Sequence, residues 1–134
     1  MAIELIILDF NGVIDTSRGF NTELIDYVAS LNLRRAVFTR LDEAPLRLAL
    51  MSAPEGMFEG LFTPNNMSYL KPATEGFIEL ADNMKIRPEA CIMVDDVMMN
   101  VEGARKAGMR AILYEGFDQF KHCLLYTSPS PRDS

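Results

Sequence analysis

Residues 3–12 read Ile3-Glu4-Leu5-Ile6-Ile7-Leu8-Asp9-Phe10-Asn11-Gly12. The first part is an apolar run of strand length, and it ends at the carboxylate of Asp9 just before a turn that contains Gly12. In open α/β sheets the ligand-binding crevice lies beyond the carboxyl ends of the strands, where side chains are held rigidly and still meet solvent. This stretch therefore predicts that Asp9 is presented in such a crevice as a nucleophile.

Composition narrows the possible classes of protein. The chain has 134 residues, 49% of them hydrophobic, which predicts one domain with no room for a second. Its net charge of −6 has the wrong sign for a phosphate-backbone binder, so nucleic acid is not an expected partner. The apolar runs are far shorter than the roughly 20 residues of a membrane span, and no signal peptide is recognisable. We expect a cytoplasmic protein that does not contact a membrane.

The sulfur-containing residues predict no disulfide and no soft-metal site. Two cysteines do not make a disulfide framework, and Cys91 lies inside an apolar run, so we expect a buried thiol. Met98 and Met99 have no clustered cysteines near them in the sequence, and His122 is the only histidine. We interpret both methionines as filling the core or a groove.

Strand-like and helix-like segments alternate along the chain, which is typical of a parallel sheet covered by helices on both faces. Strands are expected at residues 3–9, 35–39, 61–63, 91–95 and 110–114, and helices at residues 21–33, 42–51, 72–84 and 100–107. Thr22 is the expected N-cap of the first helix, and Pro72 is the expected start of the third. The predicted fold class is a doubly wound, Rossmann-like α/β sheet of about five strands.

Polar side chains follow the predicted strands. They are Asp9, Thr39, the loop residue Lys71, and the pair Asp95 and Asp96. These side chains should converge on one rim of the sheet. A carboxylate can attack phosphorus and form an aspartyl-phosphate, while Mg²⁺ bound by further carboxylates neutralises the repulsion, and lysine and threonine contact the phosphate. The set predicts phosphoryl transfer.

Each residue alone has an ordinary structural explanation. An acid at a strand end is more often a cap or a turn former, Thr39 could satisfy local backbone, and Lys71 could be a solvated charge. The adjacent acids Asp95 and Asp96 are more informative, because they repel each other unless a positive group joins them. We therefore favour a functional interpretation of the whole set.

Four motifs occur in order along the chain. They are Leu8-Asp9-Phe10-Asn11-Gly12-Val13-Ile14, the strand-terminal Thr39, Lys71-Pro72, and Val94-Asp95-Asp96 with Asn100-Val101-Glu102-Gly103-Ala104. Over residues 3–118 they resemble the four motifs of the haloacid dehalogenase-like (HAD) hydrolase superfamily. The resemblance implies a Mg²⁺-dependent phosphatase that acts through an aspartyl-phosphate intermediate.

The resemblance also implies roles for individual residues. Asp9 would be the nucleophile and a metal ligand, together with the backbone carbonyl of Asn11 and the acids Asp95 and Asp96. The substrate phosphate would be bound by Thr39, Arg40 and Lys71. The expected substrate is a small phosphorylated metabolite or a phosphoprotein.

The chain departs from the family pattern at two positions. The family's phosphatases carry an aspartate at the Asn11 position that protonates the leaving group and then activates water, and an amide can do neither. Because general acid–base help contributes on the order of 10²–10⁴-fold, we predict weak or specialised turnover of substrates with good leaving groups. Asn100 stands where the family often has another acid, which should weaken the metal site.

The resemblance further implies that this domain has no cap. The family commonly inserts a cap domain after the first motif or between the second and third, and neither gap is large enough here. A large substrate or a neighbouring subunit would then have to close the site.

Two other classes of protein share parts of this pattern. Response-regulator receivers use similar residues, but their acid pair comes first and their Lys-Pro last, so the order of motifs excludes them. A catalytically silent HAD-like domain, which binds metal and a phosphorylated ligand or a protein partner, stays open.

The C-terminal segment has a different composition. Residues 123–133 read as the in-frame translation of a sequencing-library adapter, and the other explanation is a natural disordered tail. We expect residues 1–122 to form the HAD-like α/β core and residues 123–134 to lie outside it.

Overall fold

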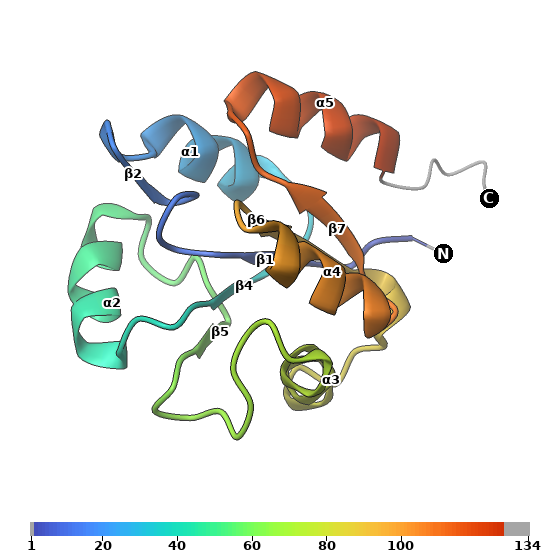
Figure 1. Cartoon of the computed structure of the whole chain (residues 1–134). Helices are drawn as coiled ribbons and strands as arrows, with labels where there is room; N and C mark the ends of the chain where they lie inside the picture. The colour runs from blue at the N-terminus through green and yellow to red at the C-terminus, as the bar shows by residue number, and fades with distance from the viewer. Residues whose placement is uncertain (1, 128–134) are drawn as a thin grey trace.

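A computed structural model describes residues 2–127, which form three layers around a parallel sheet (Figure 1). The sheet has the order β5-β4-β1-β6-β7. Its strands are β1 (Leu5–Leu8), β4 (Arg34–Phe38), β5 (Gly60–Phe62), β6 (Cys91–Asp95) and β7 (Arg110–Leu113). The predicted doubly wound α/β class is confirmed, and every predicted strand is present within two residues of its expected bounds.

Helices cover both faces of this sheet (Figure 1). On one face lie α1 (Thr22–Ser30) and α5 (Phe117–Thr127), and on the other lie α3 (Thr74–Asn83) and α4 (Met98–Lys106). The short α2 (Glu43–Ala49) joins β4 to β5 and is followed by a 3₁₀ turn (Leu50–Ser52). No helix in the described part of the chain is both long and apolar enough to cross a membrane.

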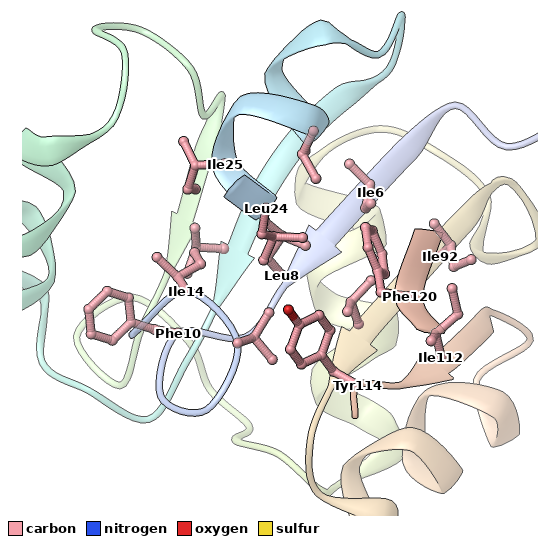
Figure 2. Close-up of a cluster of buried hydrophobic side chains, with 14 of the residues drawn as sticks. Ile6, Leu8, Phe10, Ile14, Leu24, Ile25, Ile92, Ile112, Tyr114 and Phe120 are labelled. Atoms are coloured by element: carbon pink, nitrogen blue, oxygen red, sulfur yellow. The ribbon is translucent and has the colours of Figure 1, made fainter. Parts of the chain in front are cut away.

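Alternating side chains of the strands divide the core in two. In β1, Ile6 and Leu8 point to the α1 and α5 face, whereas Leu5 and Ile7 point to the α3 and α4 face. Figure 2 shows the first of these clusters, in which side chains from α1 and α5 pack over the central strands. Burial on both faces explains why the strands read as near-continuous apolar runs.

The order of the strands places a switch point between β1 and β6. The chain runs from β1 outward to β4 and β5, and then returns to β6 on the other side of β1. Ligand sites in open α/β sheets lie at such a point, beyond the carboxyl ends of the strands. Asp9 follows β1 directly and Asp95 ends β6, so both acids lie there.

A hairpin that the sequence did not predict links β1 to α1. It consists of β2 (Asp15–Thr16) and β3 (Gly19–Phe20), and it is the only pair of strands between β1 and α1. The N-cap of α1 is Asn21, so the prediction of Thr22 was wrong. The Oδ1 of Asn21 accepts a hydrogen bond from Leu24 N at 3.3 Å, and its Nδ2 donates to Val13 O and to the Tyr114 hydroxyl at 2.9 Å each. Asn21 therefore ties together the loop after β1, the start of α1 and the end of β7.

The helix boundaries differ from expectation at several points: α1 ends at Ser30 and not at residue 33, α2 ends at Ala49 and not at residue 51, and α4 begins at Met98 and not at Asn100. Helix α3 begins at Thr74 and not at Pro72, because Ala73 N donates to Leu70 O and closes a turn before the helix; the Lys71–Pro72 peptide is cis. Helix α5 was not predicted, and it continues through the expected core boundary at residue 122, with Leu124 buried. The rest of the predicted tail, residues 128–134, lies outside the described residues.

Candidate active site

Lys71 lies at the centre of the candidate site, in the loop between β5 and α3. Its Nζ donates to Asp9 Oδ1 at 2.7 Å and to Asp95 Oδ2 at 2.8 Å. All three side chains are buried, and the Lys71 ammonium also lies 5.6 Å from the ring centre of Phe38. A buried charge is stable only when it is paired, so this ion-pair triad fixes both carboxylates around one ammonium.

Asp95 is surrounded by donors. Its Oδ1 accepts from Val97 N at 3.0 Å and its Oδ2 from Lys71, while Asn100 Nδ2 lies 3.2 Å from each oxygen. A carboxylate offers about four lone-pair positions, so these contacts satisfy it nearly completely. We therefore interpret Asp95 as a residue that holds the Lys71 ammonium in place.

Asp96 is exposed next to this triad. Asp9, Asp95 and Asp96 each offer an oxygen atom, and these atoms all lie within 4.8 Å of one another. Oxygen atoms from carboxylates are the donors that a hard cation such as Mg²⁺ prefers. This set of oxygen donors fits such an ion. As the sequence predicts, the three acids lie together at one rim of the sheet.

Gly12 makes room for the Asp96 carboxylate. Its φ of +88° lies in the left-handed region, and a Cβ built on this residue would overlap the Asp96 side chain. A larger residue would therefore suffer both backbone strain and a steric clash. Glycine is therefore needed at position 12 for two reasons: the backbone conformation of the turn, and the space that the Asp96 carboxylate occupies.

Burial raises the pKa of Asp9 to about 7, which is well above its usual value. Desolvation is the largest cause, the Lys71 charge opposes it, and the negative charge of Asp95 adds to it. Asp9 therefore lacks sufficient positive charge around it to stay fully ionised at neutral pH. A cation at this position would lower the pKa and favour the nucleophilic form.

Thr39 and Arg40 line the neighbouring strand end. The Thr39 Oγ1 accepts from Leu41 N at 3.1 Å, which leaves its hydroxyl hydrogen available to a ligand. Arg40 is exposed and its Nη1 donates to Lys71 O at 3.0 Å. Arg40 thus braces the loop that carries Lys71, in addition to the phosphate contact that the sequence predicts for it.

Asn11 is exposed in the loop after β1, where its side chain is open to solvent. The Asn11 position is joined by a backbone bridge to Asp15, and Gly12 N donates to Asp15 O at 2.8 Å, which closes this loop. Both contacts are made by the backbone and not by the Asn11 side chain.

Sequence reasoning missed or misjudged several residues of this region. Asn100 was interpreted as a weak replacement for a metal ligand, and in the structure its amide donates to Asp95. Asn100 lies five residues beyond the end of the strand, on the first turns of a helix, and this spacing could have indicated the contact with Asp95. Phe38, under Lys71, was not singled out. The prediction that Met98 and Met99 fill the core or a groove was wrong, because they are 45% and 64% exposed where α4 begins beside the acids.

The chain is similar in sequence to known hydrolases. The family model for haloacid dehalogenase-like hydrolases matches residues 18–108. Protein CbbY from Rhodobacter capsulatus is 30% identical over 95 residues, which is 68% of this chain and 42% of that protein. Fructose-1-phosphate phosphatase YqaB from Escherichia coli is 26% identical over 92 residues, which is 66% of this chain and 49% of that protein. This chain thus spans about half the length of the curated relatives it matches.

The fold is shared with solved structures. A HAD family enzyme from Bacteroides thetaiotaomicron, solved as a mutant in complex with magnesium and inorganic phosphate, superposes with a TM-score of 0.77 at 13% identity. The match covers 90% of this chain and 98% of that one. At this identity the likeness establishes the fold alone.

Proposed function

Because the chain belongs to the haloacid dehalogenase-like hydrolase family, we propose that it hydrolyses phosphate monoesters with Mg²⁺ and with Asp9 as the nucleophile. The observation that carries this proposal is the buried Lys71, bound to both Asp9 and Asp95 at the switch point of the sheet, with Asp96 beside them. Oxygen atoms of Asp9, Asp95 and Asp96 within 4.8 Å of one another are the type of donor that Mg²⁺ prefers, which supports the proposal.

Each residue has a role in the proposed reaction. Asp9 attacks phosphorus, the bond from phosphorus to the leaving oxygen breaks, and water then hydrolyses the aspartyl-phosphate to regenerate Asp9. Lys71 orients Asp9 and donates to the phosphate, and the Thr39 hydroxyl donates to a second phosphate oxygen. Asp95 positions Lys71 through their ion pair.

Three groups would hold Mg²⁺: the carboxylates of Asp9 and Asp96 and the backbone carbonyl of Asn11. When bound, the ion neutralises the charge between the nucleophile and the substrate phosphate. Asp95 contributes less than the sequence implied, because its oxygens are already occupied by donors.

The proposed substrate class follows from Asn11. Without a carboxyl group at this position no side chain protonates the leaving oxygen, so turnover is slow for alkyl phosphates and faster for acyl or aryl phosphates. Between β1 and α1 the chain has only a short hairpin, so we propose an open site that accepts a small phosphorylated metabolite or a phosphoprotein residue.

Hydrolysis of p-nitrophenyl phosphate by the full chain tests this function. We expect turnover with Mg²⁺ and none after chelation by EDTA. Turnover that is indifferent to EDTA contradicts the Mg²⁺ mechanism. A folded protein that binds Mg²⁺ and vanadate without turnover supports a second candidate function, a catalytically silent domain that binds phosphorylated ligands. The observation that favours this candidate is Asn11, whose amide cannot act as a general acid or base.

Mg²⁺ binding is expected to weaken at acidic pH. The carboxyl of Asp9 must lose its proton to bind the ion, and its pKa is raised to about 7, so affinity should fall by up to about tenfold per pH unit below that value and level off above it. Calorimetric titration between pH 5.5 and 8 measures this. The Asp9→Asn variant, which has no proton to lose at that position, is the control and should give a flatter profile; a flat profile for the unaltered protein contradicts the prediction.

Gly12→Ala is expected to impair both stability and Mg²⁺ binding. The left-handed backbone costs about 1–2 kcal/mol with a Cβ, and the overlap with Asp96 displaces a proposed ligand. Gly19→Ala is the matched control, because Gly19 has a φ of +98° but nothing within 4 Å of a built Cβ. Both variants should lose stability in urea titrations, and only Gly12→Ala should also lose Mg²⁺ affinity. Equal Mg²⁺ affinity in the two variants contradicts the role of Asp96.

A further inference from the structure

A cavity of about 840 Å³ opens beside the acid cluster. Its wall is formed by the loop after β1, the β2–β3 hairpin, the first turn of α1 and the loop between β7 and α5. Gly12 and Asp96 also line it, so the cavity adjoins the point where a phosphate would meet Asp9. The organic part of a phosphate ester therefore has space here, next to the reacting centre.

The charges that line this cavity are unbalanced. Besides Asp96, they are Glu23, Glu115 and Arg18, all exposed. With Asp96 committed to the cation, two carboxylates face one guanidinium, which leaves one net negative charge. None of the ion pairs among residues 2–127 joins Arg18 to either glutamate, so these charges remain available to a ligand.

Aromatic rings complete the cavity. Phe20 and Phe117 are half-buried in its wall, and Tyr114 lies beside them with its hydroxyl bound to Asn21. The carboxylates favour a cationic group and disfavour a second anion, and the aromatic side chains offer apolar surface to its carbon chain.

We propose that this cavity receives the leaving group of the substrate and selects one that carries a protonated amine. Glu23 and Glu115 attract the ammonium, the rings pack against its carbon chain, and a carboxylate or second phosphate is repelled. This inference rests on the proposed phosphatase function and names the substrate class of that site.

Three aryl phosphates of nearly equal size test the proposal. They are phenyl phosphates with an aminomethyl, a hydroxymethyl or a carboxymethyl group in the para position, in which a methylene keeps the phenol leaving groups similar. For the full chain with Mg²⁺, kcat/KM should decrease in that order, with about a tenfold difference between the first and the last at low salt, consistent with charge interactions at a solvent-exposed site. The difference should shrink in high salt because exposed charges are screened.

Substitutions in the cavity test whether its charged residues cause the preference for the aminomethyl ester. The double variant Glu23→Gln with Glu115→Gln leaves the Arg18 guanidinium as the remaining charge of this set, so it should reverse the order of the three esters, whereas Arg18→Gln should widen the original difference. Glu102→Gln removes an exposed carboxylate of α4 that does not line the cavity, so it should leave the order unchanged. A double variant that keeps the full amine preference overturns the assignment.

The outcomes separate this inference from the proposed function. Equal rates for the three esters, or a preference for the carboxymethyl ester, overturn the inference and leave the phosphatase function standing. If none of the esters is hydrolysed, the phosphatase function fails, and calorimetric binding of the same esters with Mg²⁺ decides the inference. Tightest binding of the aminomethyl ester then supports the cavity's selectivity, and the absence of any order overturns it.

Discussion

Asp9→Asn is expected to abolish Mg²⁺-dependent hydrolysis of aryl phosphates, with a loss on the order of 10⁴–10⁶-fold, the range that single removals from a protease catalytic triad give. The amide has nearly the shape of the carboxylate, so it fits the same buried position, but it cannot form an acyl phosphate. It also removes one carboxylate from the proposed metal ligands. The measurement is kcat/KM for p-nitrophenyl phosphate at saturating Mg²⁺.

The variant should nevertheless remain folded. The side-chain oxygen of the introduced amide can still accept from Lys71, and Lys71 keeps its ion pair with Asp95 at 2.8 Å. Burial already disfavours the ionised form of Asp9, as its raised pKa shows, so removing its charge has little effect on the free energy of unfolding. Thermal unfolding followed by circular dichroism checks this.

Asp15→Asn provides the matched control. Asp15 begins β2, is exposed and is outside the acid cluster, so the same change of side chain removes a nearby carboxylate and activity should be kept. Equal loss in both variants would mean that net charge near the site, and not a nucleophile, supports turnover. Full activity of Asp9→Asn would place the nucleophile elsewhere.

The strands and the site rim were predictable because they follow from local rules. A parallel sheet buried on both faces requires apolar runs, and residues directly after such runs lie at one edge. Asp9 and Asp95 could therefore be placed at the ends of neighbouring strands from the sequence. Their distances to Lys71 could not, because the loop that carries Lys71 is shaped by the turn before α3 and by Arg40.

The remaining features depend on contacts between distant parts of the chain. Thr22 and Asn21 are both acceptable N-caps locally, and the decision comes from the bond between Asn21 and Tyr114, which are 93 residues apart. The periodicity of α4 does not show that its first turn lies at the open rim, and so Met98 and Met99 were misplaced. Among the donors around Asp95, Val97 and Asn100 lie within five residues of it, whereas Lys71 comes from a loop 24 residues away in the chain.

Asn11→Asp is expected to raise hydrolysis of an alkyl phosphate by on the order of 10²–10⁴-fold, the usual contribution of a general acid–base group. The new carboxyl would follow the proposed nucleophile Asp9 by two residues and would supply the proton donor that the amide of Asn11 lacks. The backbone carbonyl of Asn11 is unchanged, so Mg²⁺ binding should be retained. The comparison is kcat/KM for methyl phosphate and for p-nitrophenyl phosphate.

The two substrates distinguish proton transfer from a general gain. An alkoxide needs a proton to leave and nitrophenolate does not, so the gain should be much larger for methyl phosphate. Asn32→Asp, an amide-to-acid change in the loop after α1, is the control and should change neither rate. Equal gains for both substrates, or none, would show that position 11 takes no part in proton transfer. If the unaltered protein is silent and Asn11→Asp is active, the rest of the site is already assembled for chemistry, and the silent domain differs from the enzyme by one side chain.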